Sequence, residues 1–162
     1  MNPAARLRER VLWQGVEVER TWAAGTSLST GLPVLQVSGI WLNEGGEIVL
    51  VSEPGGEWNL PGGHPQGREI PEKTLTRELA EEACAEMLTC RLLGWQRVDD
   101  PREPPYVQLR YVAQGQLREF QPAHEIRHRR LVSPQDFLSA LSWGRSPIAA
   151  GLLRVALEAK LP

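Results

Sequence analysis

The chain has 162 residues, of which 41% are hydrophobic, and this suits one globular domain with a buried core. Its formal net charge of −2 provides no general attraction to polyanions, so we expect no binding to bulk nucleic acid or to a membrane. The two cysteines are too few for a disulfide scaffold, and no run of about 18 apolar residues is present. Because the start, MNPAARLRER, also lacks the apolar segment of a secretory signal, we expect a cytoplasmic protein.

The N-terminal third predicts strands separated by turn-rich segments. Residues Val11 to Val18 indicate a short strand, and residues 23–31, AAGTSLSTG, indicate a connection. Residues 34–42, VLQVSGIWL, predict a second strand, and residues 48–52 predict a third. The turn residues at 43–46 favour a hairpin between these last two strands.

A glycine turn and an amphipathic helix are predicted next. Residues 57–60 are short and extended, and Pro61-Gly62-Gly63 ends them with a flexible backbone. Pro71 fits the first position of a helix, which we expect to run from about residue 71 to 85. Apolar residues at every fourth position predict a face that packs on a sheet: Leu75, Leu79, Ala83 and Met87.

The C-terminal half predicts more strands and two helices. The expected strands are residues 92–98, 106–113 and 126–132, and the expected helices are residues 134–141 and 147–161. The proline-rich segment at 99–105 cannot supply a central strand and is expected to be a loop.

Three glutamates share one face of the predicted helix. Glu78, Glu81 and Glu82 stand at positions i, i+3 and i+4, so their carboxylates project within about 100° of arc. Such crowding is unfavourable unless water screens it or a cation neutralises it, and Mg²⁺ and Mn²⁺ prefer oxygen ligands. Taken alone, the pattern is more typical of a solvated acidic face in which Arg77 pairs with Glu81.

The spacing upstream of the helix changes this interpretation. From Gly63, five residues lead to Glu69, and seven more lead to Arg77. Residues 63–85, GHPQGREIPEKTLTRELAEEACA, thereby resemble the Nudix box, and Pro61-Gly62 precede them as is usual in that family. All charged positions of the motif are present: Glu69, Arg77, Glu78, Glu81 and Glu82.

The match also has departures. Cys84 stands where the family has a glycine that ends the helix, and Ala85 replaces a bulky apolar residue. A glycine there supplies a left-handed stop, so Cys84 predicts either a different helix end or local strain. We expect its side chain to be small and buried. The glycine that usually precedes Glu69 is displaced to Gly67 by Arg68.

The resemblance implies a fold and a set of roles. The implied fold is α/β, a mixed β-sheet sandwiched between α-helices, with residues 1–162 as a single Nudix domain. Within it, residues 1–33 are an N-terminal extension, and residues 61–85 are the Nudix box loop and helix. The implied cofactor is Mg²⁺ or Mn²⁺, bound by Glu78, Glu81, Glu82 and the Gly62 carbonyl. The remaining roles are that Arg77 holds Glu78, and that Glu69, with Gly63, supports the loop.

A second match lies downstream of the box. Glu125-Ile126, followed by Leu131-Val132 and Asp136-Phe137, is similar to a pattern of acidic and apolar residues found in family members. The resemblance makes Glu125 a candidate fourth carboxylate, although an exposed loop glutamate fits the sequence as well. Either Glu78 or Glu125 is therefore the candidate for orienting or deprotonating water.

The resemblance implies hydrolysis of a diphosphate bond by attack of water on phosphorus. The expected partner is a small nucleotide, such as a nucleoside di- or triphosphate or a nucleotide sugar. Pro101 lies about 16 positions after the box, where ADP-ribose-cleaving members of the family tend to have proline, so the resemblance also includes an ADP-ribose-specific pyrophosphatase as an alternative. A non-catalytic nucleotide-binding or regulatory module is the main alternative. An isomerase of a diphosphate-bearing metabolite, in which Cys84 or Cys90 would act as an acid or base, is less favoured. Residues that can stack on a base or meet a phosphate are Trp58, Trp95, Tyr106, Arg97, Arg102 and Arg110.

Overall fold

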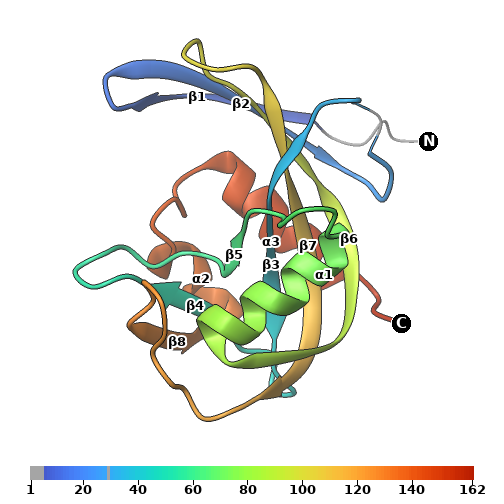
Figure 1. The fold of residues 1–162 in the computed structure, drawn as a ribbon, viewed down its shortest axis with the longest axis vertical. Coiled ribbons are helices and arrows are strands. Elements are labelled where there is room, and N and C mark those ends of the chain that lie inside the picture. The colour runs from blue at the N-terminus through green and yellow to red at the C-terminus, as the bar shows by residue number, and fades with distance from the viewer. Residues whose placement is uncertain (1–5, 29) are drawn as a thin grey trace.

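The computed structural model describes residues 6–28 and 30–162, in which an eight-stranded sheet lies between helices (Figure 1). The strands are β1 (Arg6–Trp13), β2 (Val16–Ala24), β3 (Val34–Leu42), β4 (Ile48–Ser52), β5 (Gly62–Gly63), β6 (Ala85–Asp99), β7 (Tyr106–Leu117) and β8 (His128–Val132). The helices are α1 (Pro71–Glu78), its π-helical continuation η1 (Leu79–Ala83), α2 (Pro134–Ala140) and α3 (Pro147–Glu158). None of the described helices is long and apolar enough to cross a membrane.

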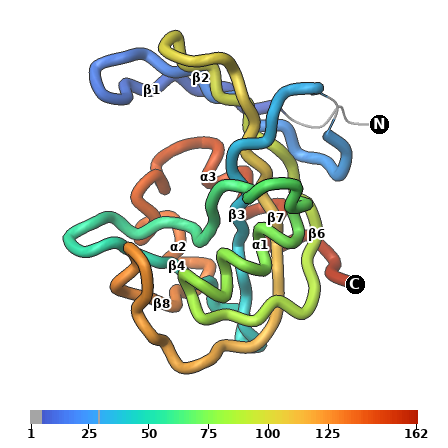
Figure 2. Tube along the Cα trace, in the orientation of Figure 1, coloured from blue at the N-terminus to red at the C-terminus, as the bar shows by residue number. Residues whose placement is uncertain are grey.

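The sheet is mixed, as predicted. Its strand order is β1-β2-β6-β7-β3-β4-β8, and β5 pairs with β3 beside this path. The β3–β7 pair is parallel, and the other pairs are antiparallel. The Cα trace shows the β1–β2 hairpin and β8 at opposite ends of the molecule (Figure 2).

Apolar side chains fill both sides of the sheet. Alternate strand residues point to opposite faces, so β3 supplies Val37 to one face and Ile40 to the other. On the first face, the helix formed by α1 and η1 packs against the sheet through Leu75, Leu79 and Ala83, which are fully buried. The other face carries the cluster that includes residues of α2 and α3: Trp22, Ile40, Leu50, Phe137 and Leu152. This arrangement is the predicted α/β/α sandwich.

Several predicted elements are confirmed. The strands at residues 34–42 and 48–52 have the predicted bounds, and they pair antiparallel at Leu42 and Ile48 across the predicted turn. The C-terminal helices end one and three residues earlier than expected, at Ala140 and Glu158. The last strand begins at His128 rather than at residue 126.

The N-terminal prediction is wrong in detail. The strand expected over Val11 to Val18 is broken by a turn at Gln14-Gly15, where both residues have positive φ, and β1 and β2 pair on either side of it. The expected connection at 23–31 begins later, because Ala23 and Ala24 belong to β2. Residues 1–5 of the predicted extension and Ser29 of this connection lie outside the described residues.

The predicted helix 71–85 is also corrected. Regular α-helix ends at Glu78, and the chain continues through a π-helical turn to Ala83. Met87 therefore lies in β6 and not on the helix stripe. Strand β6 begins at Ala85 rather than Leu92, and β7 extends to Leu117, because the two strands pair from Ala85–Leu117 to Val98–Tyr106 with two irregularities in register.

Candidate active site

The two box glycines bring the loop against both β3 and the helix. Gly62 and Gly63 pair with Ser38 and Val37 of β3. A Cβ atom on Gly62 would overlap Ser38 and the Val37 carbonyl, and a Cβ atom on Gly63 would overlap the Glu78 carboxylate. At Gly62 the obstructing atoms include backbone, so only glycine allows this close approach, whereas at Gly63 the end of the Glu78 side chain would have to move.

Arg77 joins the loop to the carboxylates of the helix. Its Nε and Nη2 atoms donate to the two Glu69 oxygens, each at 3.0 Å, and Nη2 also donates to the His64 carbonyl at 3.1 Å. Its Nη1 atom donates to Glu78 at 2.8 Å and to Glu81 at 3.3 Å. The planar guanidinium therefore connects both ends of the Nudix box.

Glu69 has a set of donors that stabilises its ionised form. It accepts hydrogen bonds from Arg77, from the Thr74 hydroxyl at 2.8 Å and from the Gln66 backbone N–H at 3.2 Å. The hydrogen bonds from Arg77 and Thr74 lower the pKa of Glu69 to about 2. Glu69 is thus an anion that ties the loop to the helix at neutral pH.

Glu82 points toward the glycine strand, the short strand β5 that consists of Gly62 and Gly63. Its Oε1 atom accepts a hydrogen bond of 2.7 Å from the Gly62 backbone N–H. Burial raises the pKa of Glu82 to about 7, and the negative charges of Glu78, Glu81 and Glu53 act in the same direction. Removing this carboxylate from water is unfavourable unless a proton or a cation compensates its charge.

The donor set fits a hard divalent cation. Glu78, Glu81 and Glu82 supply carboxylate oxygens close to the backbone of Gly62 and Gly63. Within residues 6–28 and 30–162, however, no three acidic, histidine or cysteine side chains are arranged to enclose an ion. In this arrangement Arg77 holds Glu78 and Glu81, while Gly62 holds Glu82.

Cys84 adopts the conformation that the family glycine supplies. Its φ and ψ are 50° and 40°, in the left-handed region, and its N–H bonds the Leu79 carbonyl to close the π-helical turn. Cys84 therefore ends the helix in the left-handed conformation without being a glycine, which corresponds to the second of the two expected outcomes, local strain. The side chain is half-buried rather than buried, and it contacts the Gln121 backbone.

Arg129 supports the helix end and was not anticipated from the sequence. From β8 its Nη1 atom donates to the Ala83 carbonyl at 2.9 Å and to the Arg118 carbonyl at 2.8 Å. A cation at the carboxyl end of a helix is favourable. The charged run His128-Arg129-Arg130 carried no signal that distinguished this residue from its neighbours.

Glu125 lies on an exposed turn, next to His124 with a φ of 55°. The structure gives it no hydrogen bond or ion pair with the described residues, so it is not brought into the Arg77 network. Its neighbour Ile126 belongs to the apolar cluster beneath the helix.

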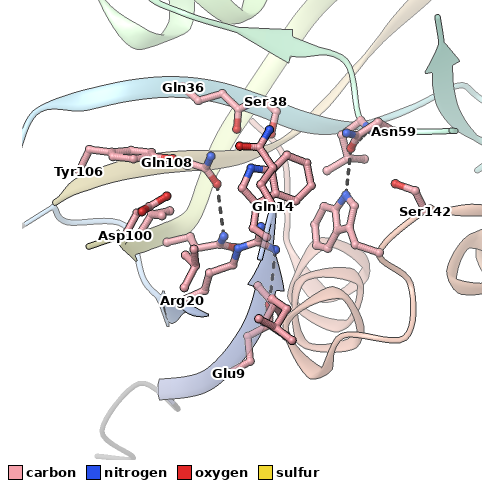
Figure 3. A pocket seen from close by; sticks show the side chains of 18 of the residues that line it. Glu9, Gln14, Arg20, Gln36, Ser38, Asn59, Asp100, Tyr106, Gln108 and Ser142 are labelled. Atoms are coloured by element: carbon pink, nitrogen blue, oxygen red, sulfur yellow. Dashed lines mark hydrogen bonds and ion pairs between the residues drawn. The ribbon is translucent and has the colours of Figure 1, made fainter. Parts of the chain in front are cut away.

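A polar cavity of about 830 Å³ opens on the other face of the sheet (Figure 3). The segment that leads into Gly62 forms part of its wall, through Asn59 and Leu60. Trp143, in the connection between α2 and α3, holds this part of the wall in place, because its Nε1 atom donates to the Asn59 side chain at 2.9 Å. Asn59 and Leu60 lead to Gly62, whose N–H donates to Glu82, so one short segment joins the cavity wall to the acidic helix.

Some of the candidate ligand-binding residues meet in this cavity. Arg102, Tyr106 and Arg110 line it, whereas Trp95 and Arg97 line a smaller pocket of about 480 Å³.

The other candidate residues lie outside these two pockets. Trp58 packs half-buried against the core, with Arg130 above its ring. Neither Cys84 nor Cys90, the cysteines considered for the isomerase alternative, lines either of these two pockets. The sequence reading missed several polar lining residues: Arg20, Gln36, Ser38, Gln96 and Gln108.

Comparison with known families identifies the fold and motif together. A family model described as NUDIX domain matches residues 32–152. The chain belongs to the Nudix family. The predicted enzyme class, a Nudix hydrolase, is thereby confirmed at the level of the family, and a search of curated proteins finds no match.

Solved Nudix structures share this fold. A mutant form of the Bacillus subtilis pyrophosphohydrolase BsRppH has a TM-score of 0.70 and 20% identity, over 86% of this chain and 91% of that one. An ADP-ribose pyrophosphatase from Streptococcus suis has a TM-score of 0.56 and 24% identity, over 78% and 90%. The NUDIX domain of Shewanella oneidensis NrtR, complexed with ADP ribose, has a TM-score of 0.60 and 21% identity, over 80% and 89%.

Proposed function

We propose that this Nudix protein hydrolyses the diphosphate bond of a small nucleoside diphosphate-linked substrate with Mg²⁺ or Mn²⁺. The observation that carries the proposal is the hydrogen bond between Glu82 and Gly62, which joins the acidic helix to the segment whose preceding residues, Asn59 and Leu60, line the 830 Å³ cavity. A substrate that spans the glycine strand can place its diphosphate beside the glutamates and another part of itself in the cavity.

Glu78, Glu81 and Glu82 would bind the cation together with the Gly62 carbonyl. When bound, such a cation neutralises phosphate charge and lowers the pKa of a coordinated water. Arg77 orients Glu78 through its 2.8 Å hydrogen bond, and Glu69 fixes Arg77 from the loop. Of the two candidates for accepting the proton of water, we favour Glu78, because Glu125 lies on an exposed turn outside this network.

A substrate panel tests the proposal. Nucleoside di- and triphosphates, UDP-sugars, ADP-ribose, dinucleoside polyphosphates and coenzyme A are assayed for product release with Mg²⁺ and then Mn²⁺. We expect cleavage of at least one class, and no turnover by Glu82→Gln. The amide retains an acceptor for the Gly62 N–H, so the variant should fold, and circular dichroism checks this.

The matched control is Glu86→Gln, which removes an exposed carboxylate paired with Arg118 and should retain activity. Full activity in Glu82→Gln contradicts the metal assignment. Tight binding of a nucleotide without cleavage of any substrate would instead support the non-catalytic module.

A further inference from the structure

Arg110 is a buried cation in the cavity without a counter-ion. It lies on β7, only 7% exposed, on the sheet face opposite α1. Its Nη1 atom donates to the Gln36 side chain at 3.1 Å and to the Ser38 hydroxyl, and its Nη2 atom donates to Gln108 at 2.9 Å. All of these acceptors are neutral, and no carboxylate of the described residues lies within ion-pair distance of it.

The guanidinium is also incompletely hydrogen-bonded. An arginine has five N–H donors, and three of them bond to Gln36, Ser38 and Gln108. The Nε atom is buried without a partner among the described residues. The Nε–H and one N–H of Nη2 therefore have no acceptor among the described residues.

The other charges of the cavity do not compensate Arg110. Asp100 pairs with Arg102 at 2.7 Å, and Glu9 faces Arg20 at 3.8 Å while also accepting from Ser146. The remaining carboxylates that line the cavity, Glu57 and Glu103, belong to exposed residues.

An uncompensated charge in this position is unfavourable for folding. Burial lowers the pKa of Arg110 to about 10, and the nearby charge of Arg20 acts in the same direction, yet the side chain stays protonated at neutral pH. Trp143, 5.5 Å from the guanidinium carbon, supplies a ring face but no negative charge. A stable protein that retains such a cation at a cavity wall is suited to an anionic ligand.

We propose that Arg110 forms an anion subsite, in which it binds a carboxylate or phosphate of the substrate other than the scissile diphosphate. The inference rests on the proposed function, because it assumes that the substrate enters this cavity. Arginine binds both anions through two parallel hydrogen bonds, and the Gln36 and Gln108 side chains hold its plane in position. The enzyme would thus select substrates that carry an extra anion near the diphosphate.

Matched ligand pairs test the subsite. UDP-glucuronate and UDP-glucose differ by a carboxylate, and coenzyme A and dephospho-coenzyme A differ by a phosphate. Dissociation constants are measured by calorimetry in EDTA, so that binding is read without hydrolysis. We expect the member with the additional carboxylate or phosphate to bind about tenfold or more tightly than the member without it, in at least one pair. The pair that shows the preference identifies the kind of anion.

Two variants locate the preference. In Arg110→Gln, the dissociation constants of the two members of a pair should differ by no more than about twofold. Gln108→Glu places a carboxylate 2.9 Å from Nη2, so it should remove the preference and also raise the melting temperature. This second variant keeps the test valid if Arg110→Gln does not fold. The control, Arg97→Gln in the smaller pocket, should retain the preference.

The result that overturns the subsite is equal binding within both pairs, or a preference that survives Arg110→Gln or Gln108→Glu. The proposed function fails by a different result, the absence of cleavage across the panel with Mg²⁺ and Mn²⁺. Because the subsite is read by binding in EDTA, the two failures are distinguishable.

Discussion

At the level of single residues, Arg77 is the residue on which the site geometry depends most. Its side chain contacts carboxylates from both ends of the Nudix box, Glu69 from the loop and Glu78 and Glu81 from the helix. The use of two guanidinium edges is possible only for arginine, because the lysine ammonium has no planar fork. The site therefore needs this shape as well as a positive charge.

We expect Arg77→Lys to reduce kcat or metal affinity by about 10–100-fold, as for other partners of metal-binding side chains. Steady-state kinetics and calorimetric Mn²⁺ titration measure the effect. The control Arg118→Lys changes an exposed ion pair with Glu86 and should leave both the kinetics and the Mn²⁺ affinity unchanged. Unchanged kinetics and metal binding in Arg77→Lys would rule out its positioning role.

The sequence predicted these residues better than it predicted the cavity. The glutamates and Arg77 are recognisable because their spacing is long and specific. Arg110 alternates with Leu109 and Tyr111, a pattern typical of a strand with one solvated face. In the structure the β1–β2 hairpin and Trp143 also line the cavity, and these contacts between distant segments have no local signal.

Among the helices and strands, the end of the Nudix-box helix is the least regular part of the site. The π-helical turn carries Glu81 and Glu82, and it ends at Cys84 in a left-handed conformation. The helix start was predictable from Pro71, but its end was not, because no sequence feature marked the change from α to π geometry. The missed hairpin turn at Gln14-Gly15 has a similar cause, since its positive φ at Gln14 is unusual for that residue.

Two substitutions at Cys84 test the strain. A non-glycine residue in the left-handed region costs roughly 1–2 kcal/mol. Both Cys84→Gly and Cys84→Val lose the contacts of the sulfur with Gln121, but only glycine relieves the backbone. We expect the glycine variant to exceed the valine variant by at least about 1 kcal/mol in free energy of unfolding, measured in urea. Equal stability would show that Cys84 is not strained.

In the molecule as a whole, the described part of the predicted N-terminal extension contributes strands β1 and β2 to the sheet. The family match begins at residue 32, yet β2 pairs with β6 from Glu19–Asp99 to Ala24–Gly94. Trp22, 1% exposed, belongs to the same apolar cluster as Ile40 and Leu152. The prediction that residues 1–162 form a single domain remains a prediction, and these contacts favour it.

We therefore expect thermal unfolding to show one cooperative transition. Trp22→Ala should lower the free energy of unfolding by about 3–5 kcal/mol and shift the whole transition, because it leaves a cavity in the shared core. The exposed Trp13, 55% accessible, offers a control, since Trp13→Ala removes little buried surface. Two separate transitions, with only one moved by Trp22→Ala, would contradict the single domain.

The proposed function depends above all on divalent cations held by the glutamates of the Nudix-box helix beside the glycine strand. A crystal of the protein soaked in Mn²⁺ and measured for anomalous scattering would locate such ions. We predict an anomalous peak within coordination distance of Glu82, with Glu78, Glu81 or the Gly62 carbonyl as further ligands. A crystal saturated with Mn²⁺ that shows no peak at this helix, or an equal peak in Glu82→Gln, would contradict the metal assignment.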